Sequence, residues 1–236
     1  MISRLTPAEL RRRNDRMLFF EREQWQNGAR LVAGLDEAGR GPLAGPVVAA
    51  AVIFDVDKYF PEVDDSKLLS QDNRETLFEI ILAHASAIGV GYVSHDDIDR
   101  INILRATYKA MHQAVDRLSL TPEYLLIDGN RFVGNGIPYT TIIDGDAGSF
   151  TIAAASIVAK VCRDRLMVAY EALYPGYGFA KHKGYGTKEH RNAIQTLGLC
   201  DIHRRSFTTT DQLELSFDTD DEIGSGQLSE IPHSQN

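Results

Sequence analysis

One stretch near the start of the chain, Leu31 to Phe54, constrains the fold more than any other part. It reads LVAGLDEAGRGPLAGPVVAAAVIF, so two apolar runs flank an acidic, glycine-rich corner. The second run, Val47 to Phe54, contains no charged residue, and such a run is typical of a strand covered on both faces. The corner therefore lies inside a well-packed sheet, which is an unusual place for acidic side chains.

The acidic corner, DEAGRG at Asp36 to Gly41, allows more than one interpretation by itself. The ordinary one is a strand that ends in a glycine turn, without any function for its acids. A dinucleotide-binding fingerprint is excluded, because three residues separate Gly41 from Gly45 and Pro42 lacks a backbone amide for a phosphate. Residues elsewhere in the chain must decide between a simple turn and an acidic site.

The composition indicates one sizeable core, since 43% of the 236 residues are hydrophobic. The two cysteines, Cys162 and Cys200, have no CxxC or histidine-rich spacing, so neither a disulfide framework nor a zinc site is indicated. The N-terminus lacks the apolar segment of a signal peptide, and no run is long enough to span a membrane. We therefore expect a cytoplasmic monomer that does not associate with membranes.

The charge is distributed unevenly along the chain. The net charge of −8, taken alone, argues against a nucleic-acid partner. Seven of the 33 acidic residues follow Arg205, where no Lys or Arg occurs, so 26 acidic and 25 basic residues precede that point. A nearly neutral body can present a basic face to nucleic acid. The acidic end from about Asp211 is predicted to be disordered.

Periodicity and turn residues predict an alternation of strands and helices. The expected helices are Pro7 to Asn27, Gln71 to Ala83, His95 to Leu118, Phe150 to Leu173 and Lys188 to Leu197. The expected strands are Leu31 to Glu37, Val47 to Phe54, Ala87 to Val93, Tyr124 to Ile127 and Pro138 to Ile143. Small residues such as Ala153 and Ser156 open the long helix, so we expect its start to lie against the acidic corner.

Four acidic residues stand at or just past the ends of three predicted strands: Asp36, Glu37, Asp128 and Asp146. Carboxylates from several strands converge only where a ligand offsets their repulsion, and Mg²⁺ prefers such oxygen donors. Two ions roughly 3.5–4 Å apart can activate a water and stabilise the leaving oxygen of a phosphoryl displacement, which is nuclease chemistry. Asp144 competes with Asp146 for the fourth position, and spacing alone does not decide between them.

Asp36 and Glu37 present a geometric problem, because neighbouring residues in a regular strand point to opposite faces. In a regular strand, Asp36 and Glu37 cannot both point one way. We therefore predict that the chain leaves extended geometry at Glu37 to Gly39, where Ala38 and Gly39 favour a bulge or turn.

Five ordered motifs give the chain a family resemblance. They are GLDEAGRGPLAGPVVAAAV in the first strand pair, DDSKLLS at Asp64 to Ser70, LLIDGN at Leu125 to Asn130, GDAGSFTIAAASIVAKVCRDR at Gly145 to Arg165, and KHKGYGT at Lys181 to Thr187. On these motifs the chain resembles the ribonuclease HII family, the prokaryotic type 2 ribonucleases H, from about Leu31 to Phe207. The resemblance implies a ribonuclease H-like α/β fold, with a central mixed five-stranded sheet, flanking helices and a small helical C-terminal lobe.

The resemblance also implies a domain organisation and an activity. A helical extension at residues 1–28 would precede a catalytic domain at 29–209, and an acidic disordered tail would follow at 210–236. The activity would be hydrolysis of RNA in RNA/DNA hybrids, including incision 5′ to single ribonucleotides embedded in duplex DNA, with 3′-hydroxyl and 5′-phosphate products. The alternatives are another nuclease of the same fold, such as a junction resolvase, and a catalytically inactive hybrid-binding module.

By the same resemblance, the catalytic metal ligands are Asp36, Glu37, Asp128 and Asp146, which would hold two Mn²⁺ or Mg²⁺ ions. Asp146 is preferred to Asp144 because the family's acid stands in this Gly-Asp setting. The presence of all four acids argues against the inactive binding module. The sequence leaves open a replication or repair partner and the role of the N-terminal helix.

Further residues are implied in substrate binding: Gly39, Arg40, Gly41, Tyr185, Lys67, Lys181 and Lys183. The glycines let the backbone approach a sugar, and the 2′-hydroxyl is the group that distinguishes RNA from DNA. The ring of Tyr185 can pack on the neighbouring deoxyribose, and this pairing with GRG argues against another nuclease of the fold. The three lysines either form a solvated face or contact phosphates. Arg163 is expected to brace its own helix.

Removal of the acidic tail, residues 210–236, should leave the melting temperature nearly unchanged, because this segment has few large apolar groups. Hybrid binding should be unchanged or stronger at low salt, since a negative tail competes with phosphates for a basic face. Thermal unfolding and hybrid titrations at two salt concentrations measure both effects. A large drop in melting temperature would show that the tail is docked.

Overall fold

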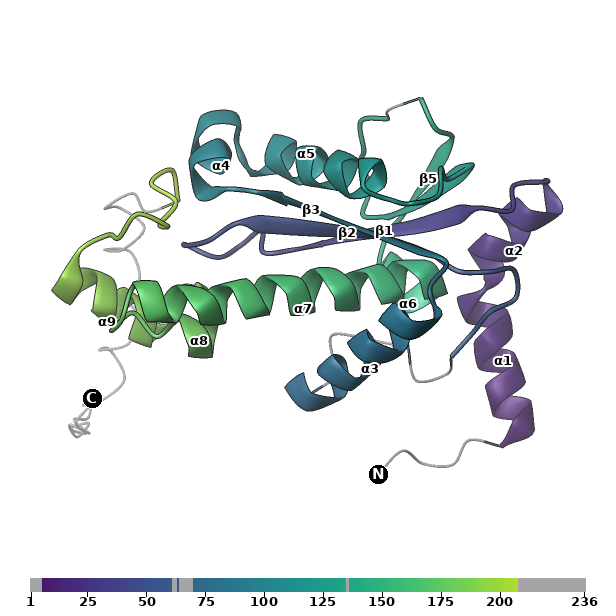
Figure 1. Cartoon of the computed structure of the whole chain (residues 1–236), viewed down its shortest axis with the longest axis horizontal. Helices are drawn as coiled ribbons and strands as arrows, with labels where there is room; N and C mark the ends of the chain where they lie inside the picture. The colour runs from purple at the N-terminus through teal and green to yellow at the C-terminus, as the bar shows by residue number, and fades with distance from the viewer. Residues whose placement is uncertain (1–5, 61–62, 64–69, 135, 208–236) are drawn as a thin grey trace, which may run out of the picture. The chain divides into compact units, whose positions relative to one another are not determined.

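A computed structural model describes residues 6–60, 63, 70–134 and 136–207 (Figure 1). By its internal contacts the chain divides into a unit that ends at Arg204 and a second unit that begins at Arg205. All named helices and strands belong to the first unit. None of the helices in the described ranges is long and apolar enough to cross a membrane. The predicted tail lies outside the described residues.

A five-stranded sheet forms the centre of the first unit, in the order β3-β2-β1-β4-β5. The strands are β1 (Val32–Ala38), β2 (Val47–Ile53), β3 (Ala87–Val93), β4 (Tyr124–Asp128) and β5 (Tyr139–Ile142). β1, β2 and β3 pair antiparallel, whereas β1, β4 and β5 pair parallel, so the sheet is mixed as predicted. The parallel pairing brings the carboxyl ends of β1 and β4, where acids stand, to the same edge.

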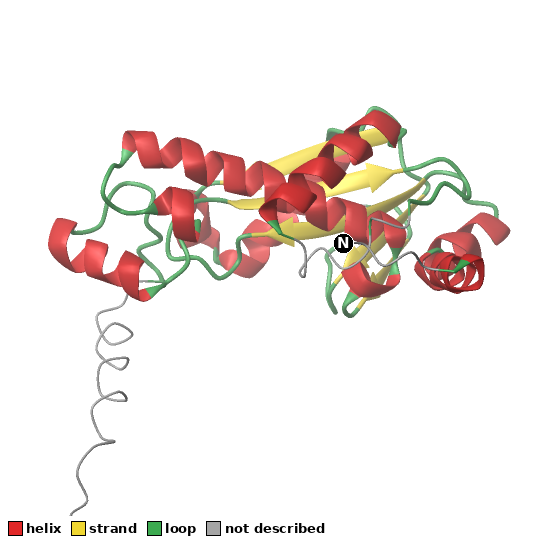
Figure 2. Cartoon of the chain, turned by 90° about the horizontal axis from the view of Figure 1, so that it is seen from below, coloured by secondary structure: helices red, strands yellow, loops and turns green. Residues whose placement is uncertain are grey.

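Helices cover both faces of the sheet (Figures 1 and 2). On one face lies α5 (Ile103–Asp116), preceded by α4 (His95–Ile101), and on the other lie α7 (Phe150–Leu173) and α3 (Gln71–His84). All seven residues of β2 are buried between these layers, as its apolar sequence predicted. The remaining helices are α1 (Pro7–Met17), α2 (Phe19–Gln26), α6 (Gly145–Gly148), α8 (Phe179–His182) and α9 (Lys188–Leu197).

Two helices predicted as continuous are broken. Asn102 interrupts the expected helix at His95 to Leu118, with φ of 68°, and its side chain accepts a hydrogen bond from the Arg105 amide at 3.1 Å to start α5. The first helix starts at the predicted capping box but breaks at Leu18, where Met17 and Leu18 are both fully buried. Local periodicity could not reveal either break. The break at Asn102 follows from the backbone conformation of that one residue, and the break at Leu18 follows from burial against the rest of the fold.

The backbone of α7 lies directly on β1 at Gly34. A Cβ added to Gly34 would lie 2.2 Å from the carbonyl carbon of Thr151 and 2.3 Å from the amide nitrogen of Ile152. Ala153 and Ala155 are fully buried in the same turns of α7. The small residues at the start of this helix therefore serve the close approach that the sequence predicted.

Gly34→Ala should lower the free energy of unfolding by about 2–3 kcal/mol, because the methyl group has no space against the α7 backbone. Urea denaturation at constant m-value measures the loss. Gly41→Ala is the matched control, since a Cβ there would meet nothing within 4 Å. Equal stabilities for the two variants would contradict the close contact.

Candidate active site

The two adjacent acids on β1 lie in a regular strand. β1 stays paired with β2 through Ala38, and Asp36 and Glu37 stand opposite Ala50 and Ala49 without a bulge. The chain turns only at Gly39, whose φ is 95°. The predicted distortion at Glu37 is therefore wrong, because the unbroken ladder with β2 holds this residue extended. β4 stops pairing with β1 at Leu35, so the following residues of β1 have no strand on that side.

Asp36 lies buried between this strand end and α7. It is 6% exposed, and it accepts hydrogen bonds from the Glu37 amide at 2.6 Å and from the Ser156 side chain. Burial, together with the negative charges of Glu37 and Asp128, raises the pKa of the Asp36 carboxyl well above its ordinary value. Ser156 was expected to favour close packing, but it also fixes this carboxylate.

Glu37 borders an open cavity beside α7. Burial raises the pKa of its carboxyl, whereas the guanidinium of Arg40, at 3.2 Å, lowers it. The cavity is lined by Glu37, Gly39, Arg40, Ser156, Lys160 and Tyr185, among others. The structure therefore brings a predicted metal ligand and the predicted junction-reading residues to one place, although Tyr185 follows Glu37 by almost 150 residues.

The other two predicted ligands lie on β4 and α6. Asp128 accepts a hydrogen bond from the Gly145 amide at 2.7 Å, and its charge raises the pKa of Asp36 and of Glu37. Asp146 is 2% exposed on α6, whereas Asp144 is exposed and adopts a left-handed conformation with φ of 52°. Of the two rivals, only Asp146 has the burial expected of a residue that faces the other acids.

The donor chemistry of these acids fits a hard divalent cation. Asp36, Glu37 and Asp128 repel one another electrostatically, as their influence on each other's pKa shows, and a cation would relieve that repulsion. In the described part of the chain, no three Asp, Glu, His or Cys side chains are close enough to enclose an ion by themselves. Mg²⁺ commonly retains several waters and needs only one or two carboxylates, so this open arrangement suits it.

Two buried arginines hold the loop after β1. Arg204 is fully buried and donates hydrogen bonds to the carbonyls of Gly39 at 2.6 Å, Arg40 at 2.8 Å and Gly45 at 2.9 Å. Burial lowers the pKa of the Arg204 guanidinium, which nevertheless remains a cation at neutral pH. No sequence pattern indicated the role of Arg204, because its partners lie about 160 residues away.

Arg163 joins the same loop to the KHKGYGT segment. This fully buried side chain of α7 donates to the carbonyls of Pro46 at 3.0 Å, Ala44 at 3.2 Å and Lys183 at 3.0 Å. The sequence predicted that Arg163 braces its own helix; the structure shows that it links α7 to two loops. Beside it, Asp164 pairs with Lys160 at 2.6 Å.

Tyr185 presents its ring at the cavity, where it is 43% exposed. The guanidinium of Arg163 and the ammonium of Lys160 lie 5.8 Å and 5.9 Å from the ring centroid. These distances are within the range of cation–π attraction. The ring is therefore held at the cavity while one side remains available to a ligand.

Two buried histidines support the backbone of Tyr185. The Cys200 amide donates to His203 Nδ1 at 2.9 Å, so the proton of a neutral His203 ring is on Nε2. That nitrogen donates to His190 Nε2 at 3.1 Å, and His190 Nδ1–H donates to the Tyr185 carbonyl at 2.9 Å. No sequence pattern indicated this chain of hydrogen bonds, since neither histidine belongs to a recognisable spacing.

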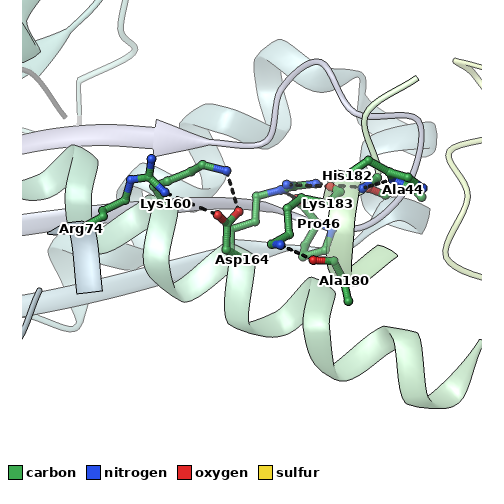
Figure 3. Close-up of polar contacts among 10 residues, drawn as sticks. Ala44, Pro46, Arg74, Lys160, Asp164, Ala180, His182 and Lys183 are labelled. Carbon is green, nitrogen blue, oxygen red and sulfur yellow. Dashed lines mark hydrogen bonds and ion pairs between the residues drawn. The ribbon is translucent and has the colours of Figure 1, made fainter. Parts of the chain in front are cut away.

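The three predicted phosphate-binding lysines have different surroundings. Lys67 lies outside the described residues. Lys181 is exposed and pairs with Glu189 at 2.5 Å. Lys183 is 8% exposed, adopts a left-handed conformation and donates to the Ala180 carbonyl (Figure 3). Of the two lysines that the structure describes, only Lys181 has the exposure that a phosphate contact needs.

Comparisons with known proteins identify the family of this chain. The family model described as Ribonuclease HII matches residues 33–210. The chain belongs to the ribonuclease HII family. A ribonuclease HII of Syntrophus aciditrophicus is 57% identical over 188 residues, which are 80% of this chain and 89% of that protein. As a member of this family, the protein is an endoribonuclease that acts on RNA/DNA hybrids.

Solved structures confirm the ribonuclease H-like fold. Ribonuclease H2 of Pyrococcus horikoshii superposes with a TM-score of 0.65 at 26% identity, over 80% of this chain and 99% of that one. Ribonuclease HII of Archaeoglobus fulgidus, solved in complex with PCNA, superposes with a TM-score of 0.66 at 27% identity, over 76% of this chain and 96% of that one. The family's fold thus extends over most of the enzyme.

His190 should make the stability of the enzyme pH-dependent. Burial lowers its pKa from 6.5 to about 4, with a further contribution from His182 and His203. Between pH 6.5 and about 4, His190 is protonated in the unfolded chain more readily than in the folded protein. The contribution of neutral His190 to the free energy of unfolding is therefore fully present above pH 6.5 and is lost as the pH falls toward about 4. His190→Gln should flatten this part of the curve of unfolding free energy against pH.

The control for this measurement is His84→Gln, because His84 is exposed at the end of α3. Its curve should be parallel to that of the wild type. A His190→Gln curve that is also parallel to the wild-type curve would contradict the role of burial.

Proposed function

We propose that this endoribonuclease cuts by two-metal-ion catalysis and incises 5′ to single ribonucleotides in duplex DNA. Two Mg²⁺ or Mn²⁺ ions would be held by Asp36, Glu37, Asp128 and Asp146, with 3′-hydroxyl and 5′-phosphate products. The observation that carries the proposal is the single cavity that joins Glu37, the Gly39–Gly41 loop and Tyr185. Cleavage chemistry and recognition of the RNA–DNA junction would therefore lie side by side.

The protein's contribution to the chemistry is to fix the carboxylates before the substrate binds. Ser156 and the Glu37 amide orient Asp36, and the Gly145 amide orients Asp128. When bound, two divalent ions activate a water and stabilise the leaving oxygen of an in-line displacement. Attack by water requires no covalent intermediate, so no side chain needs to act as a nucleophile.

Recognition of the junction would depend on the loop held by Arg204. With the carbonyls of Gly39 and Arg40 fixed, the backbone of this loop can be presented to a 2′-hydroxyl without first being ordered. Tyr185 would pack on the next sugar, which must be a deoxyribose to fit closely. A site built to bond a hydroxyl discriminates strongly against its absence, because its polar groups are then left unpaired.

Contacts beyond the junction are proposed from charge and from relatives. Lys181 would contact a phosphate of the hybrid after its ion pair with Glu189 is broken. The phosphate contacts of Lys67 and Lys183 stay predictions. The Archaeoglobus ribonuclease HII was solved with PCNA, so a replication protein is the class of partner to test. We expect the enzyme to act as a cytoplasmic monomer.

Asp128→Asn should nearly abolish cleavage at saturating Mg²⁺ while preserving the fold, because the substitution removes a ligand charge but hardly changes size. Single-turnover cleavage of an RNA/DNA hybrid measures the loss, and circular dichroism checks the fold. Asp146→Asn should be equally severe, whereas the exposed Asp144→Asn is the matched control and should stay near wild type. Cleavage by Asp128→Asn within a few-fold of wild type would remove Asp128 from the site.

Tyr185→Ala should lose far more activity on a single embedded ribonucleotide than on an all-RNA hybrid, because it removes the surface for the deoxyribose at the junction. The measured quantity is the ratio of the two rates. Lys181→Ala is the control, with a salt-dependent effect that should be similar on both substrates. A ratio unchanged by Tyr185→Ala would show that this ring does not recognise the junction.

A further inference from the structure

A buried carboxylate from the N-terminal helices holds the turn between α6 and α7. Glu21 of α2 is fully buried, and 128 residues separate it from Ser149 in the sequence. Its Oε1 accepts hydrogen bonds from the Ser149 hydroxyl at 2.6 Å, the Thr151 amide at 2.9 Å and the Thr151 hydroxyl at 2.8 Å. One oxygen of α2 is thus bonded to the first turn of α7.

Ser149 links this carboxylate to the segment that carries Asp146. The Ser149 amide donates to the Gly145 carbonyl at 2.8 Å and so closes α6, while its hydroxyl caps α7 by accepting from Ile152 at 3.3 Å. The other end of α6 is also fixed, because the Gly145 amide donates to Asp128. Asp146 therefore lies on a four-residue helix that is held at both ends. Its start is hydrogen-bonded to Asp128, and its end is linked through Ser149 to Glu21.

Apolar contacts bring α2 to the same corner. A Cβ built on Gly148, the last residue of α6, would lie 3.7 Å from the ring of Phe20. Phe20 also packs against the apolar cluster that contains Ile142 and Ile152. Neighbouring residues of α2, Phe20 and Glu21, therefore contact the turn through an apolar and a polar side chain.

Stability alone is a poor explanation for a carboxylate in this place. Burial raises the pKa of Glu21, and its Oε2 makes no hydrogen bond with the residues that the structure describes. Three donors and the amino end of the 24-residue α7 offset part of this cost. An apolar side chain of similar volume is often at least as stabilising as a buried charge. The arrangement is better suited to fixing the geometry of the turn.

We propose that Glu21 is a positioning residue for Asp146. The N-terminal helices α1 and α2 would then help to hold the catalytic site in place. This inference rests on the proposed function, in which Asp146 binds a divalent cation. Groups that orient a ligand without touching the ion change metal affinity by about 10–100-fold when they are removed. Loss of Glu21 should therefore appear in metal affinity and not in affinity for the hybrid.

The experiment measures the Kd of Mn²⁺ for the full-length protein without nucleic acid, by electron paramagnetic resonance or calorimetry. Glu21→Ala should raise this Kd about tenfold, with an unchanged KM for the hybrid at saturating Mn²⁺. Glu21→Gln keeps the size and one acceptor oxygen, so it should restore most of the affinity. Gln24→Ala is the matched control, because Gln24 is another nearly buried polar residue of α2 and should change stability alone.

The possible outcomes distinguish this inference from the proposed function. A folded Glu21→Ala with wild-type Mn²⁺ affinity, beside a weakened Asp146→Asn, would overturn the positioning role only. Wild-type affinity in Asp146→Asn would overturn the metal role of Asp146 and the inference with it. Should Glu21→Ala not fold, Ser149→Ala removes one of the three donors, and unchanged Mn²⁺ affinity in that folded variant would equally overturn the inference.

Discussion

The contact between the α7 backbone and β1 at Gly34 determines the rest of the site. Because no side chain separates the helix from the strand, Ser156, about one helical turn after Ile152, reaches Asp36. Further along α7, the side chain of Arg163 donates a hydrogen bond to the loop that follows β1. At the start of the helix, next to the Gly34 contact, Ser149 adjoins the segment with Asp146. A larger residue at Gly34 would displace the helix and with it all these groups.

Buried charged groups carry much of the positioning. Arg163 and Arg204 are fully buried cations that donate to backbone carbonyls in the loop after β1, and Glu21 is a fully buried acid that accepts from the start of α7. A buried charge costs free energy unless it is hydrogen-bonded, and removal of its partners is strongly destabilising. These side chains thus fix the backbone of the loop after β1 and of the turn before α7.

The sequence predicted most of the sheet and the long helix, because their apolar periodicity is strong. β3 and α7 have the predicted boundaries, and four acids could be selected because they stand at strand ends beside glycines. Their roles as metal ligands stay predictions. The predicted departure from extended geometry was wrong at Glu37 and Ala38, because both residues stay paired with β2, and the chain turns only at Gly39. Arg204 and Glu21 were missed for a different reason: a charged residue in a sequence is ordinarily exposed, and their partners lie more than a hundred residues away.

The most direct test is cleavage of duplex DNA that contains one ribonucleotide, with the all-DNA duplex beside it. With Mg²⁺ or Mn²⁺, we expect a single incision 5′ to the ribonucleotide, with a 3′-hydroxyl and a 5′-phosphate, and no cleavage of the all-DNA duplex. A chelator should stop the reaction, and fresh metal should restore it. Cleavage that persists in the chelator, or equal cleavage of the all-DNA duplex, would contradict a metal-dependent site that reads the 2′-hydroxyl.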